Sequence, residues 1–472
     1  MRKRISYLLY SCLALMALLS SCGEDRSGEY YALIATKTWI YEVMQENYLF
    51  YEDIPAEEKL DFFKKPAEFL TSAASSKDQK NGYVFSHVDS VFSRATSTYP
   101  CFGFEAALVR TGNGTNVLRV LYTQPDSPAE EAGLKRGDWI IAIDNQKVST
   151  SDYTTYITHP TKAYSFTLGK YNPYPEEVED PEFNYVEFDT LGTVQMPEPR
   201  YVEEKDVLKT GIVSAGSRKA FYLLYNEFDE NTDRLKEVLS QMSGQQFDDV
   251  ILDLRYNPGG YVSTSQVLGS ALAPATAMGQ PFLHMIYNDK LNKTETLNFD
   301  ASLLPGGNSL SYQNLYIITS GNTASASEII INCLRPYMEG RLFQVGTSTY
   351  GKNVAQQLFT NAESPGIELW LTTTYLSNSQ GYYDYFTNGL LPDYEIEENY
   401  GGDLAELGSA QDELIQPVLY KMANGTFPVT ATEEGNGAAT SSRSRDIRQM
   451  QVLVDPIAQK PHLNLLQRKS DF

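Results

Sequence analysis

Short apolar runs bounded by turn residues alternate with amphipathic stretches in the second half of the chain. The runs at 218–225, 250–254 and 315–319 are rich in β-branched and aromatic residues, which predicts buried strands. The stretch at 231–242 repeats apolar residues at helical spacing, which predicts an amphipathic helix. Strands that alternate with helices in this way predict an α/β core with parallel strand pairing.

A serine lies where a predicted strand turns into a predicted helix. After the run at 315–319 the chain reads Ser-Gly-Asn-Thr-Ala-Ser-Ala-Ser-Glu, and Ser325 would begin the helix. A helix N-terminus carries free N–H groups that can hold an oxyanion, so Ser325 is a candidate nucleophile. Lys352 is the candidate base, which must be neutral and therefore desolvated, and Gln356 could orient its amine. The alternative is that Ser325 and Glu328 form an ordinary capping box.

A second motif follows the predicted strand at 250–254. The chain continues Arg-Tyr-Asn-Pro-Gly-Gly, and Gly259 and Gly260 would let backbone N–H groups approach a ligand closely. The alternative is a plain turn, because Asn-Pro and Gly-Gly mark turns in any protein.

The two motifs together resemble a known family. Asp-Leu-Arg-x-Asn-Pro-Gly-Gly at 253–260, Thr-Ala-Ser-Ala-Ser-Glu at 323–328 and Tyr-Gly-Lys-x-x-x-Gln at 350–356 occur in this order. This set resembles the C-terminal processing peptidases, which are tail-specific serine proteases. The resemblance implies a mixed α/β fold whose catalytic core is crotonase/ClpP-like.

The same resemblance implies site residues. Ser325 would be the nucleophile, Lys352 the general base and Gln356 the residue that positions the lysine. The oxyanion hole would consist of the backbone N–H groups of Ala326 and of Gly259 or Gly260. No cofactor and no metal is implied.

Two departures from the family pattern lie near the lysine. The segment between Ser325 and Lys352 is slightly longer than expected, and Asn353 stands where a glycine is common. Neither departure removes a catalytic side chain, but either could shift the lysine.

The region before the catalytic core resembles a PDZ domain. Residues 127–144 read as a short helix, a Gly-Asp turn and a strand, and Cys101–Phe104 matches a carboxylate-binding loop. A captured peptide would add as a strand, with its C-terminus on the backbone of Phe102, Gly103 and Phe104. Phenylalanines in such loops are more often core residues than ligand contacts.

The first 22 residues resemble a lipoprotein signal. Arg2, Lys3 and Arg4 precede the apolar stretch at 8–19, and Leu-Ser-Ser-Cys-Gly resembles a bacterial lipobox ending at Cys22. The implied product is lipidated on Cys22, and the acidic residues that follow resemble surface-export signals of Bacteroidetes-type lipoproteins. We therefore expect a location in the cell envelope, on the periplasmic or surface face of the outer membrane. The alternative is a plain secretory signal with an incidental cysteine.

Composition agrees with an exported enzyme. The formal charge of −22 opposes nucleic-acid binding, which needs basic patches. Outside the signal only Cys101 and Cys333 remain, so the chain is not a disulfide scaffold, and its four histidines show no metal-ligand spacing. The sequence leaves the oligomeric state open.

These patterns predict five regions. Residues 171–210 are acidic and Pro-rich and are expected to form a solvated hairpin or excursion that begins the catalytic domain. Residues 451–454 are expected to dock as a strand within a partly mobile tail. The regions are 1–21 (signal), 22–94 (N-terminal helices), 95–170 (PDZ domain), 171–430 (Ser-Lys peptidase domain) and 431–472 (tail).

The function expected from the sequence is endopeptidase cleavage of exported proteins near free C-termini, through a Ser-Lys dyad and an acyl-enzyme. Two alternatives stay open. The first is a catalytically idle PDZ scaffold that binds C-termini. The second is a non-peptidase enzyme that uses the Gly-Gly oxyanion hole of a crotonase-like core.

Overall fold

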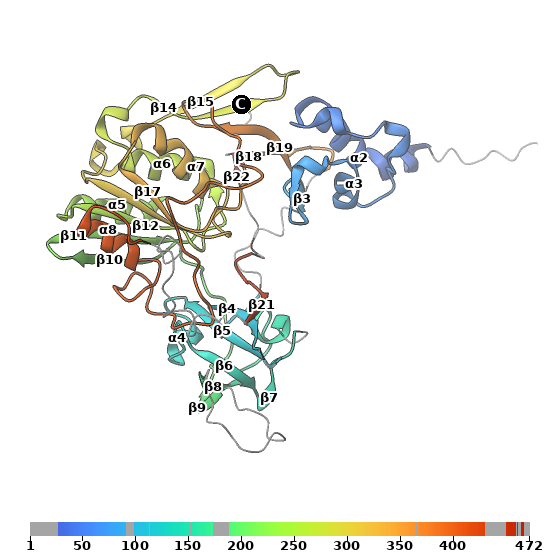
Figure 1. Ribbon diagram of the computed structural model, residues 1–472. Helices are drawn as coiled ribbons and strands as arrows, with labels where there is room; N and C mark the ends of the chain where they lie inside the picture. Colours follow the sequence, from blue (N-terminus) through green and yellow to red (C-terminus); the bar gives the residue numbers. More distant parts are fainter. Residues whose placement is uncertain are drawn as a thin grey trace, which may run out of the picture. The chain divides into compact units, whose positions relative to one another are not determined.

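The computed structural model (Figure 1) divides into two compact units. One contains the chain up to Ser90 together with Phe359–Leu371, and the other contains Val91–Leu358 together with Thr372–Phe472. The residues described are 27–90, 99–112, 114–150, 153–172, 188–364, 366–429, 450–458, 460 and 464–466.

The smaller unit is built on two helices, as the sequence predicts for the N-terminal region. Helix α2 (Ser27–Asn47) buries Ile40 and Met44, and α3 (Pro66–Ala73) packs in the same unit. Strand β3 (His87–Ser90) pairs antiparallel with the start of β19 (Ile367–Ser377), so a late segment of the chain completes this unit. Two short strands add to it, β1 (Gln79–Lys80) and β2 (Tyr83–Val84).

The PDZ-like domain is a seven-stranded antiparallel sheet around a core of its own. Short helix α4 (Pro128–Glu131) begins at Ser127, whose hydroxyl accepts the Glu130 N–H at 3.2 Å. In sheet order the strands are β21 (Gln451–Val454), β4 (Phe104–Arg110), β5 (Asn116–Thr123), β6 (Trp139–Ile143), β8 (Ser165–Tyr171) and β9 (Phe188–Gln195), with β7 (Gln146–Lys147) beside β6.

Strand β9 corrects one expectation. It pairs antiparallel with β8 from Phe188 opposite Tyr171 to Gln195 opposite Ser165. The described part of this region therefore begins with a strand that completes the PDZ-like sheet, paired with the preceding β8, and does not begin the catalytic domain. A hairpin places its two strands side by side in one sheet. The acidic composition of the sequence between β8 and β9 does not indicate that β9 pairs back onto β8.

The catalytic core is the predicted α/β sheet. Strand β11 pairs in parallel with β12, β12 with β16, β16 with β17 and β17 with β20, and only β10 is antiparallel. Apolar side chains of the sheet and of helices α5, α6 and α7 form its largest buried cluster. The strands are β10 (Val207–Ala215), β11 (Arg218–Tyr225), β12 (Asp249–Asp253), β16 (Asn314–Thr319), β17 (Leu342–Gly346) and β20 (Tyr394–Glu395), and the helices are α5 (Asp233–Ser243), α6 (Val262–Leu272), α7 (Ala326–Leu334) and α8 (Gln416–Asn424).

A third sheet joins distant parts of the chain. Its order is β13-β22-β18-β19-β14-β15, and the two-residue strand β22 comes from the end of the chain. The C-terminal segment therefore contributes both β21 and β22, of which the sequence predicts the first. Their partners here are β13 (Gly260–Tyr261), β22 (Asn464–Leu465), β18 (Val354–Thr360), β14 (Pro281–Tyr287) and β15 (Thr294–Asn298).

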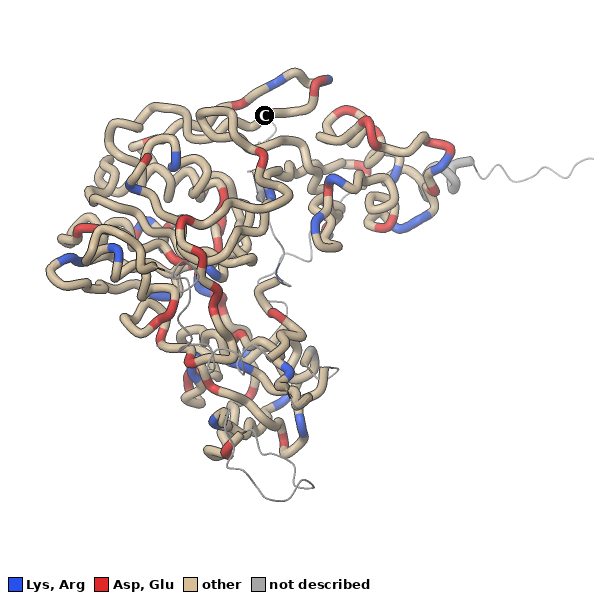
Figure 2. The backbone as a smooth tube through the Cα atoms, in the orientation of Figure 1, with Lys and Arg blue, Asp and Glu red and all other residues tan. Residues whose placement is uncertain are grey.

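The signal segment, Cys22 and residues 430–449 lie outside the described residues. No helix among the described residues is long and apolar enough to cross a membrane. Cys101 and Cys333 are both free thiols. Acidic and basic positions are interspersed along the described backbone (Figure 2).

Candidate active site

Ser325 occupies a strained turn between β16 and α7. The capping box of Ser325 and Glu328 is formed, but the serine backbone has φ 66° and ψ −118°, whereas a capping serine normally adopts extended angles. Positive φ in a residue with a Cβ is costly and is kept mainly at functional sites. Ser325 is fully buried, and Ala326 follows it as the first helical residue, where the N–H has no partner within the helix.

The Glu328 carboxylate holds the serine and lysine segments together. Its Oε2 accepts the backbone N–H of Ser325 at 2.7 Å and of Lys352 at 2.8 Å. Its Oε1 accepts the Thr349 hydroxyl and the Gly351 N–H, each at 2.6 Å. One carboxylate oxygen therefore fixes the backbones of both candidate catalytic residues.

Glu328 itself is fully buried. Burial raises the pKa of its carboxyl above the usual value, while the four hydrogen bonds oppose that rise. In the sequence Glu328 stands out only as half of a capping box, and its contact with the lysine segment gives no local signal.

The lysine amine is held by a buried chain of amides and hydroxyls. Lys352 Nζ donates to Gln356 Oε1 at 2.7 Å, and Gln356 Nε2 donates to Thr372 Oγ1 at 2.9 Å. All three side chains are fully buried. Thr372 is a residue that the sequence did not single out, because it lies on β19, far along the chain from the motif.

The Gly-Gly turn packs against the serine helix. Asn257 O accepts the Ala324 N–H at 3.1 Å and the Ser327 hydroxyl at 3.2 Å. The Gly259 N–H donates to Asn257 Oδ1 at 2.9 Å, so one of the two predicted oxyanion donors is already engaged. A Cβ on Gly260 would lie 2.2 Å from Phe228 O at φ 138°, which explains the need for glycine there.

Asn353, which stands where a glycine is common in the family, forms two hydrogen bonds with later parts of the chain. Asn353 Nδ2 donates to Tyr383 O at 2.7 Å, and Asn353 O accepts the Leu376 N–H at 2.9 Å. These bonds hold the loop after the lysine against β19. No group of His, Cys, Asp and Glu that could hold a metal ion occurs among the described residues.

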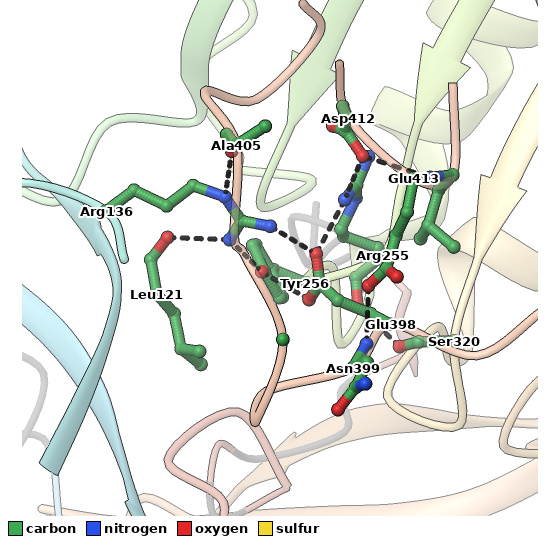
Figure 3. A network of polar contacts seen from close by, with 12 residues as sticks. Leu121, Arg136, Arg255, Tyr256, Ser320, Glu398, Asn399, Ala405, Asp412 and Glu413 are labelled. Carbon is green, nitrogen blue, oxygen red and sulfur yellow. Dashed lines mark hydrogen bonds and ion pairs between the residues drawn. The ribbon is translucent and has the colours of Figure 1, made fainter. Parts of the chain in front are cut away.

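A buried charge network is centred on Arg255, which precedes the Gly-Gly motif in the chain (Figure 3). Arg255 donates to Asp253 at 2.7 Å, to Asp412 at 2.8 Å and to Glu398 at 2.6 Å. Ser320, in the turn before Ser325, donates its hydroxyl to Arg255 O at 2.5 Å. The turn before Ser325 is thus bonded to the backbone of the residue whose guanidinium holds the three carboxylates.

The PDZ-like domain enters the same network through Arg136. Its guanidinium donates to Glu398 Oε1 at 2.5 Å, to the Tyr256 hydroxyl at 2.8 Å and to the carbonyl of Ala405 at 2.7 Å. Desolvation raises the pKa of Glu398, but Arg136, Arg255 and the Tyr256 hydroxyl outweigh it and lower that pKa to about 2.

The predicted carboxylate-binding loop lines a cavity of about 400 Å³. Cys101, Gly103 and Phe104 contribute to the lining. The rings of Phe102 and Phe104 belong to the buried core of the domain. The side chain of Phe102 is 1% exposed, so its part in a loop of this kind would be its backbone.

Fold and site together define a class of α/β proteins that join a PDZ domain to a serine-bearing strand–helix turn. Three family models match the chain: Peptidase family S41 over 219–396, the Peptidase S41 N-terminal domain over 35–94 and a PDZ domain over 119–161. A solved structure from Bacteroides fragilis, described as a "Putative S41 protease", is 30% identical with a TM-score of 0.70, over 82% of this chain and 97% of that one. The chain belongs to peptidase family S41.

Curated relatives carry the name of the C-terminal processing proteases. The Carboxyl-terminal-processing protease of Synechocystis is 27% identical over 319 residues, which is 66% of this chain and 66% of that protein. The Carboxy-terminal processing protease CtpB of Bacillus subtilis is 24% identical over 277 residues, 57% of this chain and 52% of that protein. The chain therefore spans just under two thirds of the length of the Synechocystis protein and about half of the Bacillus one.

Proposed function

We propose that the chain is a serine endopeptidase that cuts protein substrates near their C-termini through Ser325 and Lys352. The observation that carries the proposal is the Glu328 carboxylate, one oxygen of which binds the backbones of both residues. A capping role alone gives no reason for the lysine segment to share that oxygen.

The reaction follows from the residues around the serine. Ser325 Oγ attacks the scissile carbonyl while Lys352 Nζ takes its proton, and the N–H groups of Ala326 and Gly260 hold the oxyanion. The lysine then gives the proton to the leaving amine, which leaves an acyl-enzyme on Ser325. A water molecule, deprotonated by the same lysine, releases the acyl group.

The surroundings of the lysine support its role as a base. A lysine acts as a base only when it is neutral, and desolvation favours that form. Lys352 is fully buried, and its amine donates to the neutral oxygen of Gln356 at 2.7 Å. Gln356 would therefore orient the amine without adding a charge to it.

The test is cleavage of an unfolded protein with a free apolar C-terminal tail. We expect the native enzyme to cut it and the variants S325A and K352A to lose at least a thousandfold in kcat, in line with dyad losses in serine enzymes, of order 10³ or more. Equal cutting by K352A would mean that another group is the base. If no form cuts but the tail still binds, the chain is a PDZ scaffold, whereas acyl-CoA turnover would favour the crotonase-like alternative.

We also propose that Cys22 carries the lipid that holds the enzyme at the cell envelope. The proposal rests on the basic, apolar and Leu-Ser-Ser-Cys sequence of the first 22 residues. Labelling with a radioactive fatty acid should mark the native chain and leave C22A unmarked. A labelled C22A would refute lipidation at this residue.

A further inference from the structure

The C-terminal segment of the chain occupies the edge of the PDZ-like sheet. Strand β21 pairs antiparallel with β4, with Gln451 opposite Arg110 and Val454 opposite Leu108. Strand β4 leaves the Cys101–Phe104 loop directly, and a captured peptide adds to such an edge as a strand. Because β21 runs toward the loop, it has the direction that a peptide needs to bring its C-terminus there.

Residues that follow β21 line the cavity at the loop. Pro456 and Lys460 line the same 400 Å³ cavity as Gly103. Lys460 forms ion pairs with Glu105, at 3.4 Å, and with Glu204. The segment is therefore anchored by charge at the place where a peptide carboxylate would enter.

The same segment reaches the turn that carries the nucleophile. Asn322 Nδ2, three residues before Ser325, donates to Asp455 Oδ2 at 2.9 Å. Ile457 is fully buried in the cluster that also contains Tyr122 of the PDZ-like domain and Tyr256 of the Gly-Gly motif.

Strand β22 then inserts between the two strands that border the catalytic groups. Asn464 and Leu465 pair in parallel with Gly260 and Tyr261 of β13. On the other side Leu465 pairs with Gln356, and the Leu466 N–H donates to Gln356 O at 3.0 Å. The backbone of the tail thus lies between the proposed oxyanion glycine and the residue that holds the lysine amine.

The catalytic side chains are closed off in this arrangement. Ser325 and Lys352 have no exposed surface, and neither residue lines the cavity at the loop or the larger one of about 980 Å³ beside β21. A peptide that added to β4 would have to displace β21. A peptide that lay along Gly260 would have to displace β22.

We propose that strands β21 and β22, with the described residues 455–458 and Lys460 between them, form an internal pseudosubstrate that occupies the PDZ groove and the strand slot at the active site together. Incoming proteins with a free, apolar C-terminus compete with this segment, first at β4 and then at β13 and β18. The inference rests on the proposed function, since it assigns an inhibitor to the same site. Its alternative is that the tail is a fixed part of the fold.

The first test is hydrogen–deuterium exchange on the full chain carrying S325A, which cannot cut. A short peptide ending in two apolar residues with a free carboxylate should speed exchange at 451–454 and 464–466 at least tenfold. The same peptide with a C-terminal amide should not. If fluorescence anisotropy shows binding while exchange at both strands stays unchanged, the proposal is overturned. Absence of any binding to the chain also overturns it. Because S325A is inactive by design, these outcomes do not depend on catalysis.

The second test is kinetic. V452P places a proline inside β21, where proline disfavours strand pairing, and V429P makes the same change at a valine that is 67% exposed and outside any strand. We expect V452P to raise kcat/KM for a tail-bearing substrate at least threefold and V429P to leave it unchanged. A fall in kcat/KM for V452P would overturn the proposal in favour of a fixed structural strand. If the native enzyme and V452P are both inactive while the exchange test succeeds, the proposed catalytic function fails and the tail inference stands.

Discussion

At the scale of single residues, Ser325 combines a proposed nucleophilic role with backbone strain. Its φ of 66° costs about 1–3 kcal/mol for a residue with a Cβ. We predict that S325G, which relieves the strain, is more stable than S325A by about 1 kcal/mol. Urea unfolding of both variants measures the difference, and both should be inactive. Equal stabilities would show that the turn is not strained.

Glu328 supports a second prediction. In E328Q one of the two carboxylate oxygens becomes an NH₂ group, which cannot accept the N–H or hydroxyl donors that face it. Each buried donor left unpaired costs about 1–3 kcal/mol. If that cost appears in the transition state, kcat falls about tenfold to a hundredfold, since 1.4 kcal/mol is a factor of about ten.

Steady-state kinetics with a tail-bearing substrate checks the prediction for Glu328. KM should change little, because Glu328 is proposed to orient the backbones of Ser325 and Lys352 and not to touch the substrate. A change confined to KM would contradict the assigned role. E237Q serves as the control, since Glu237 is an exposed carboxylate on α5.

At the scale of elements, Glu398 ties the PDZ-like sheet to the catalytic core. Its pKa of about 2 lies below the ordinary value of 4.5, so its contribution to stability is complete above pH 4.5 and is lost as pH falls toward 2. We predict that E398Q lowers the free energy of unfolding at neutral pH by about 3 kcal/mol, the cost of breaking a buried ion pair.

The pH dependence provides the check on Glu398. Urea unfolding of the native chain and E398Q at falling pH should give a difference that shrinks below pH 4.5. E203Q, at an exposed carboxylate, should show almost no difference at any pH. A gap between native chain and E398Q that stays constant with pH would refute the assigned cause.

The sequence predicts the elements better than their partners. The strands at 218–225, 315–319 and 451–454 were visible as apolar runs, and the structure has them as β11, β16 and β21. The partners of β9 and β22 were not visible, because pairing between distant segments leaves no local periodicity. The same holds for the site: local motifs identified Ser325 and Lys352, whereas the contact of Glu328 with Lys352 depends on tertiary structure.

At the scale of the whole molecule, the net charge of −22 determines how kcat/KM for charged substrates responds to salt. Substrates with acidic tails are repelled over distances that salt shortens, to about 10 Å at 0.1 M. We predict that kcat/KM for an acidic-tailed substrate rises several-fold between low salt and about 0.2 M, while a neutral-tailed substrate changes little. Kinetics on the two substrates at matched salt tests this, and an equal response of both would refute it.

Strand β22 has a consequence for biogenesis. Residues 464–466 are synthesised more than a hundred residues after Gln356. Among the described strands β13 and β18 are joined through these residues, so their sheet cannot be completed before the residues have been made. Until then Gly260 and Gln356 lack the strand that lies between them.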